Sequence, residues 1–264
     1  MIKKVFPKRV IGRMFLLAAI VAFAEMEFGG VLRAQEVVQG LEEAGVPLAP
    51  LGAVTSTQNP LQIAILHWYN ANLTTQMAVG MPVGIAFDGA SIWVVNSSAT
   101  VDKLRASDGA LLGTFTVGAF PGGVAFDGAN IWVANGGSNT VTKLRASDGK
   151  NLGTFTVGTG PAFLAFDGAN IWVTINSSSS VTKLRTSDGK NLGTFTVGTG
   201  PGGVAFDGAN IWVANFSSNN VTKLRASDGA LLGTFTVGTG PEFLAFDGAN
   251  IWVTNQGGTT LSKL

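Results

Sequence analysis

The chain contains no cysteine among its 264 residues, which excludes disulfide bonds, thiolate nucleophiles, cysteine-ligated metals and lipid-modified cysteine anchors. Histidine is almost absent too: His67 is the single imidazole and stands in an apolar stretch, where we expect a structural role. Without a second histidine there is no histidine-rich metal site. We therefore expect no metal and no organic cofactor, and a fold that is stabilised by packing alone.

Charged side chains are also scarce, at 12% of the residues, whereas hydrophobic residues make up 46% and there are 36 glycines. This composition is typical of short buried strands joined by tight turns. Five of the 17 basic residues lie within the first 24 positions, which leaves 12 basic against 16 acidic residues in the remainder. We therefore do not expect nucleic acid or another polyanion as a partner.

The first 24 residues follow the order of a secretory signal peptide: basic residues, the apolar run 14–24, and small residues at Ala22 and Ala24. An uncleaved membrane anchor is the alternative, but eleven apolar residues fall short of the roughly 20 that span a bilayer. We predict cleavage after Ala24 and export to the periplasm, the cell surface or the medium, with no membrane segment left. Residues 25–60 become rich in Pro, Ala and Gly and are interpreted as a linker.

The rest of the chain is repetitive. The phrase P-x-x-x-A-F-D-G-A-N-I-W-V begins at positions 82, 121, 161, 201 and 241, with one Asn-to-Ser change in the first copy, so the spacing is 39 and then 40 residues. Within the repeat 121–160, four β-rich runs appear: GGVAF, ANIWVAN, TVTKLRA and LGTFTVG. Asp127-Gly128 separates the first two runs and Asp148-Gly149 the last two, as in tight hairpins.

Four strands per 40-residue period predict an all-β fold, a β-propeller of four-stranded antiparallel blades over residues 61–264. A helical solenoid is disfavoured because no 3.6-residue period is present, and a parallel β-helix because its coils do not fold back in hairpins. Residues 63–80 align with 101–118 and are interpreted as a half-blade, while the last repeat stops inside its third strand. Both a closed five-bladed ring and a truncated larger ring are consistent with this pattern.

These strand phrases, with W-V-A-N at Trp132 and Trp212, resemble the bacterial YVTN-type β-propeller repeat. The resemblance covers about residues 63–264 and implies an exported or surface propeller, a family that shares architecture rather than one activity. Virginiamycin B lyase is a neighbouring family, whose likeness would imply a metal held by histidine and glutamate. No position here matches that motif, because the repeats contain no histidine and Glu242 is their single glutamate.

Most polar residues of the repeat have an architectural interpretation. The Asp of each F-D-G and S-D-G is expected to bind turn amides, and the Trp of each second strand to lie in the blade core. The Lys and Arg of K-L-R share a strand face, and we expect them to form a solvated ladder. The Ser of S-D-G has no histidine partner for a catalytic triad. We therefore expect no enzyme activity.

Differences between the repeats are concentrated just after the repeat proline and in the loop between the second and third strands. The loop entering the first strand and the loop between the second and third strands emerge on one face of a propeller. The candidate binding residues on this face are Phe120, Phe163, Phe216, Glu242 and Phe243. The expected function is a non-catalytic exported binding or scaffold module for an unidentified protein or polysaccharide. Drift in tolerant loops, a lyase-type enzyme and a truncated non-functional repeat protein are the alternatives.

Overall fold

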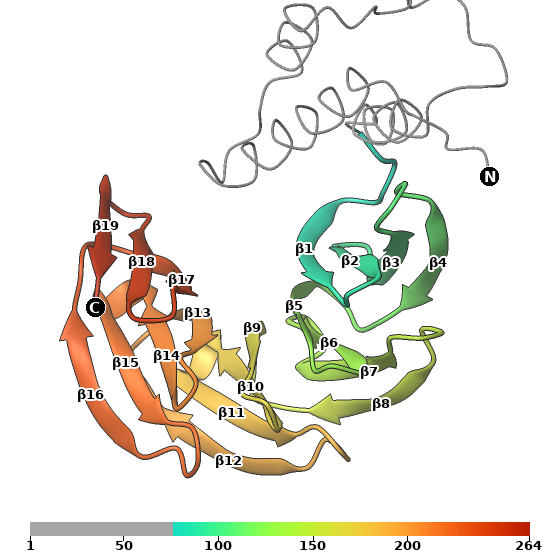
Figure 1. Cartoon of the computed structure of the whole chain (residues 1–264). Coiled ribbons are helices and arrows are strands. Elements are labelled where there is room, and N and C mark those ends of the chain that lie inside the picture. The colour runs from blue at the N-terminus through green and yellow to red at the C-terminus, as the bar shows by residue number, and fades with distance from the viewer. Residues whose placement is uncertain (1–75) are drawn as a thin grey trace, which may run out of the picture. The chain divides into compact units, whose positions relative to one another are not determined.

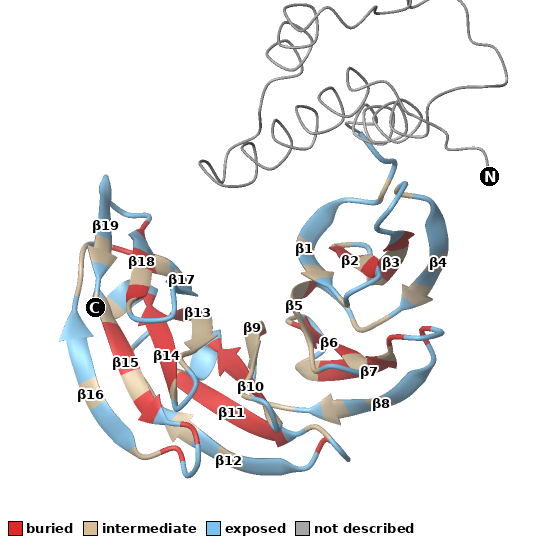
Figure 2. Ribbon diagram, in the orientation of Figure 1, coloured by how far each residue is buried: buried red, intermediate tan, exposed pale blue. Residues whose placement is uncertain are grey.

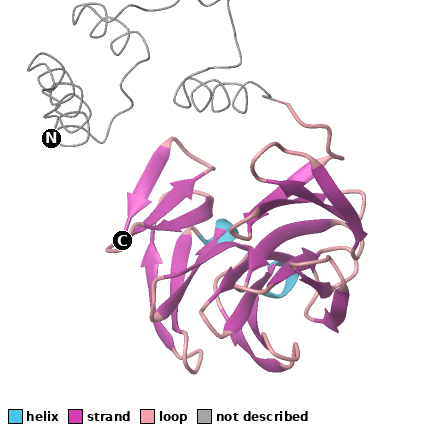
Figure 3. Cartoon of the chain, turned by 45° about the vertical axis from the view of Figure 1, so that its right-hand side comes forward, coloured by secondary structure: helices cyan, strands magenta, loops and turns pink. Residues whose placement is uncertain are grey.

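The computed structural model describes residues 76–264, and within this range the chain consists of strands, turns and two single-turn 3₁₀ helices (Figure 3). The strands form five antiparallel sheets. The first sheet contains β1 (Pro82–Phe87), β2 (Ser91–Asn96), β3 (Thr100–Arg105) and β4 (Leu111–Thr116). The second contains β5 (Pro121–Phe126), β6 (Asn130–Asn135), β7 (Thr140–Arg145) and β8 (Asn151–Thr156).

The third sheet contains β9 (Pro161–Phe166), β10 (Asn170–Ile175), β11 (Ser180–Arg185) and β12 (Asn191–Thr196), with η1 (Asn176–Ser178) between its middle strands. The fourth contains β13 (Pro201–Phe206), β14 (Asn210–Asn215), β15 (Asn220–Arg225) and β16 (Leu231–Thr236), with η2 (Phe216–Ser218) in the same place. The fifth contains β17 (Pro241–Phe246), β18 (Ile251–Asn255) and β19 (Thr260–Lys263).

In every sheet the strands pair in chain order, and the first strands of successive sheets lie side by side in the order β1, β5, β9, β13 and β17 (Figure 1). This is the blade arrangement of a β-propeller with about five blades, so the predicted fold class is confirmed. The predicted signal peptide, the linker, His67 and most of the half-blade 63–80 lie outside the described residues.

The Asp-Gly dipeptides make the predicted hairpin turns. Gly128 and Gly149 have φ angles of +95° and +74°, a region that glycine enters without a steric penalty. Asp127 completes the first turn, because its Oδ1 accepts hydrogen bonds from the amides of Ala129 and Asn130 at 2.9 and 2.7 Å. The same bonds recur in the other sheets, so the predicted local role of these aspartates is confirmed.

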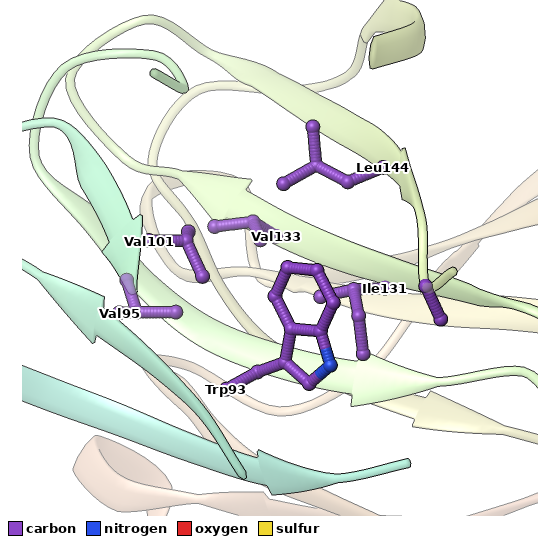
Figure 4. Close-up of a cluster of buried hydrophobic side chains, with 7 residues drawn as sticks. Trp93, Val95, Val101, Ile131, Val133 and Leu144 are labelled. Atoms are coloured by element: carbon purple, nitrogen blue, oxygen red, sulfur yellow. The ribbon is translucent and has the colours of Figure 1, made fainter. Parts of the chain in front are cut away.

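The hydrophobic core lies between the sheets. The middle strands are buried, whereas the fourth strands are largely exposed (Figure 2). Between the first two sheets, one side consists of Trp93, Val95 and Val101, and the other of Ile131, Val133, Leu144 and Ala146 (Figure 4). We call these two kinds of surface the Trp face and the Ile face of a sheet. The arrangement recurs at the next three interfaces, and it confirms that Trp93, Trp132, Trp172 and Trp212 are core residues.

The lysines of the K-L-R segments correct one prediction, because they do not form a solvated ladder with the arginines. Lys183 is only 6% exposed, and its Nζ lies 5.1 Å from the centre of the Trp172 ring. The ammonium also donates to the carbonyl oxygens of Ala226 and Ser227 in the next sheet, at 2.7 and 3.1 Å. The sequence pattern predicted that this ammonium is solvated. In the structure it is stabilised instead by the indole ring and by carbonyl acceptors of the neighbouring sheet.

Candidate recognition face

The loop that enters each first strand lies against the loop between the second and third strands of the same sheet. Backbone hydrogen bonds join the two loops: the amide of Gly136 donates to the carbonyl oxygen of Phe120 at 2.9 Å, and that of Phe216 donates to Gly200 at 2.9 Å. The amide of Gln256 donates to Gly240 in the last sheet. The loop before the first strand therefore adjoins the loop between the second and third strands, and we call this side of the sheets the loop face.

Phe120 has an unusual backbone. Its φ angle is +47°, while the residues at the same place in the following repeats are Gly160, Gly200 and Gly240, with φ angles between +62° and +72°. A side chain in this left-handed region is strained, and for a bulky residue such a backbone is uncommon. The ring lies beside Gly137 but remains 74% exposed, so the strain is not offset by burial.

Phe216 begins η2 and is the second aromatic residue on the loop face. Its side chain is 39% exposed, and its ring approaches Gly240, in the loop that enters the last sheet. Phe216 thus bridges the loops of two neighbouring sheets. Phe120 belongs instead to the loops of the second sheet.

Phe163 and Phe243 lie on first strands rather than in loops. Phe163 belongs to β9 and Phe243 to β17, yet their rings meet edge to face across β13, with centroids 5.8 Å apart. The intervening strand carries Gly202 and Gly203, and a Cβ on Gly203 would collide with the backbone of Glu242 and approach that of Phe243. The glycines of β13 therefore allow its neighbour to approach closely, while Phe243 itself remains 52% exposed.

Glu242 directly precedes Phe243 on β17, and its carboxylate approaches Gly202. Burial raises the pKa of Glu242 above its usual range, because the charged carboxylate is partly removed from water. A cation or a hydrogen-bond donor bound beside it would stabilise the charged form. Of the five predicted binding residues, the structure therefore pairs the rings of Phe163 and Phe243, and Glu242 directly precedes Phe243 on β17.

The sequence prediction missed two features of the structure. The first is the strain at Phe120, which the glycines at the same place in sister repeats could have indicated. The second is Asp102 on β3, a carboxylate that is 6% exposed and accepts hydrogen bonds from Asn96 Nδ2 at 2.8 Å and Thr114 Oγ1 at 2.6 Å. Thr142, Thr182 and Thr222 hold this place in the next repeats, so the substitution was visible in the sequence.

One hollow lies away from these phenylalanines. A pocket of about 580 Å³ lies on the Ile face of the first sheet, lined by Met77, Ile85, Val94 and Leu104 among others. Over residues 76–264, no group of three or more His, Cys, Asp or Glu side chains is placed to hold a metal ion. In the same part of the chain, no helix has the length and apolar character needed to span a membrane.

Comparison with solved structures supports the architecture. The chain superimposes on Kuenenia stuttgartiensis hydrazine synthase with a TM-score of 0.59 and 20% identity, covering 68% of this chain and 57% of that one. It superimposes on a functionally unknown protein from Desulfotomaculum acetoxidans DSM 771 with a TM-score of 0.61 and 17% identity, covering 68% and 64%. The chain thus spans less than two thirds of either protein, and at this identity the likeness concerns the fold alone. No protein-family model and no curated protein matches the sequence.

Proposed function

We propose that the chain is an exported, non-catalytic propeller of the YVTN type that binds a protein or a polysaccharide through its loop face. The observation that carries the proposal is Phe120, an exposed aromatic residue held at a positive φ angle where sister repeats have glycine. Strain that the fold does not need is typical of functional positions.

Phe216 on the loop face and the pair Phe163 and Phe243 on the first strands offer further aromatic contact area. Phe243 and Phe216 also expose a large part of their rings, and Phe163 supports Phe243 from β9. Aromatic rings with fixed positions provide contact area at a small cost in conformational entropy, which makes them frequent anchors in protein and sugar recognition. Glu242, the residue before Phe243, adds a partly desolvated carboxylate near Gly202, suited to a hydroxyl or amide donor.

The roles of the aspartates support a non-catalytic interpretation. Asp167 is engaged by turn amides and by the Trp172 indole, and Asp188 pairs with Arg185 in an exposed turn. These carboxylates serve the hairpins in which they stand. The lyase-type alternative requires a bound metal, so one equivalent of a transition metal in the dialysed protein would favour it over our proposal.

Export is proposed from the order of residues in the first 24 positions. The secreted protein is expected to begin at Glu25, as N-terminal sequencing of the product from the medium or periplasm would establish. A chain that is found in the membrane fraction and still begins at Met1 would contradict the export proposal. The binding proposal is tested separately.

The binding test replaces Phe163 and Phe243 with glycine, the residue of the sister strands β5 and β13, and Phe216 with glycine, as at Gly136. Both the triple variant and the unmodified protein are screened against immobilised cellulose, chitin and peptidoglycan and against proteins of the cell surface. The expected result is a melting temperature within a few degrees of the original and loss of attachment. If the variant still attaches to every probe that the unmodified protein binds, the differences between repeats reflect sequence drift in tolerant loops. A fall in the free energy of unfolding of about 3 to 5 kcal/mol would show that the rings are core residues.

A further inference from the structure

The first sheet keeps its Ile face open. Ile85 and Phe87 on β1 are 70% and 56% exposed, whereas Val124 and Phe126, which hold these places in the second sheet, pack into the core beside the first sheet. The apolar pocket described above lies on this open face. Among residues 76–264, the face therefore has the composition of a buried blade interface without a neighbouring sheet.

The last sheet keeps its Trp face open. Leu261 on β19 is 57% exposed, whereas Val101, its counterpart in the first sheet, is fully buried. Lys263 lies 5.4 Å from the centre of the Trp252 ring and is exposed. Its counterpart Lys103 donates to the carbonyl oxygens of Ala146 and Ser147 in the next sheet, at 2.7 and 3.2 Å.

The segment before β1 shows how the Ile face of the first sheet and the Trp face of the last sheet fit each other. Phe115, at the end of β4, lies over Gly149 of the next sheet, and Met77 lies over Gly109 of the first sheet in the same way. The segment just before β1 thus occupies the place that the end of a preceding sheet's fourth strand would take. The last sheet ends at β19 and lacks a fourth strand in the described part of the chain.

We propose that the Trp face of the last sheet binds the Ile face of the first sheet of a second copy of this chain. Four internal interfaces already use this pairing, and β1 and β17 of one copy do not pair this way in the structure. In the complex, Lys263 donates to the carbonyl oxygens of Ala106 and Ser107 of the second copy, and the free edge of β19 meets the segment around Met77. The contact joins two different surfaces, so it is heterologous and continues into a closed ring or an open chain of copies.

Complementary variants test this arrangement. Ile85→Glu with Phe87→Glu blocks the first sheet, and Leu261→Glu with Lys263→Glu blocks the last. The unmodified chain is expected to sediment above the mass of one copy, and each blocked variant at that mass. An equimolar mixture of the two should form a complex of two chains, because each retains the face that the other lacks. Leu192→Glu, at a 43% exposed leucine of β12, is the control and should associate like the unmodified chain.

Cross-linking gives a second measurement that does not depend on charged substitutions. Because the chain contains no cysteine, Lys263→Cys in one copy and Ser107→Cys in another introduce one thiol each. Oxidation of the mixture should give a disulfide-linked pair of unlike chains, whereas either variant alone should give little.

Three results would overturn the proposal. They are a monomeric unmodified chain, blocked variants that fold but do not combine on mixing, and a Ser107→Cys/Lys263→Cys double variant that cross-links only within one chain. The last result would show that the faces close on each other in the same copy. None of these results bears on attachment through the loop face, so the binding proposal is tested separately.

Discussion

At the scale of single residues, Phe120 combines strain with exposure. Replacing it with glycine removes the steric conflict at φ +47° and costs little packing, because the ring is 74% exposed. We expect Phe120→Gly to leave stability unchanged or raise it by up to about 1 kcal/mol, the usual range for relieving a left-handed side chain. Attachment should weaken at the same time. Chemical denaturation measures the first effect, and a clear loss of stability would show that the ring supports the fold.

The Trp–Asp hydrogen bond is the residue-scale contact that recurs in every sheet. Trp172 is fully buried, and its indole nitrogen donates to Asp167 Oδ2 at 2.7 Å. Asp167→Ala leaves that donor without its acceptor, which should lower the free energy of unfolding by about 1 to 3 kcal/mol. Asp188→Ala is the matched control: it removes a turn aspartate whose ion pair with Arg185 is exposed, so the loss should be smaller. Equal losses in urea denaturation would contradict this account.

At the scale of the strands, neighbouring sheets are joined by buried lysines as well as by apolar packing. Lys183 on β11 donates to carbonyl oxygens of the next sheet beside the Trp172 ring. Lys183→Met keeps the apolar stem but removes the charged donor, so we expect a loss of about 1 to 3 kcal/mol. Lys190→Met, in an exposed turn, should change stability by less than about 0.5 kcal/mol. Indistinguishable denaturation curves for the two variants would show that the buried ammonium contributes nothing.

The strands show where the sequence pattern was sufficient. A repeat of four β-rich runs and two Asp-Gly dipeptides predicted β5 to β8 to within a residue or two, because hairpin geometry depends on residues that are close in the chain. The environment of Lys183 could not be predicted in this way, since its acceptors stand 43 and 44 residues later in another sheet. The contact between Phe163 and Phe243 joins strands two sheets apart, which a pattern within one repeat does not encode.

At the scale of the whole molecule, the turn carboxylates of Asp88 and Asp207 link stability to pH. Burial alone would raise the pKa of Asp207, but hydrogen bonds from Asn210, from the Trp212 indole and from two backbone amides outweigh it and lower the pKa. Asp88 has the same balance, with burial opposed by the Trp93 indole and backbone amides, and its pKa is also lowered. In the unfolded chain these groups return to an ordinary pKa near 3.9. Their contribution is therefore fully present above that value and is lost as the pH falls through it toward the lower folded pKa.

We accordingly expect a nearly constant melting temperature from pH 7 to about pH 5 and a fall from about pH 4 downward, because the unfolded chain then binds protons that the folded chain does not. Glu242 has the opposite but weaker effect. Its pKa is raised in the folded state, so the folded chain binds this proton at a higher pH than the unfolded chain does, and acidification stabilises the fold at this residue. Asp207→Asn should melt lower than the unmodified protein at pH 7, and the difference should narrow by pH 2.5, where the carboxylate of the original is losing its advantage. Melting followed by circular dichroism across this range gives both comparisons. A difference that stays constant with pH would show that Asp207 acts through its shape and not through its charge.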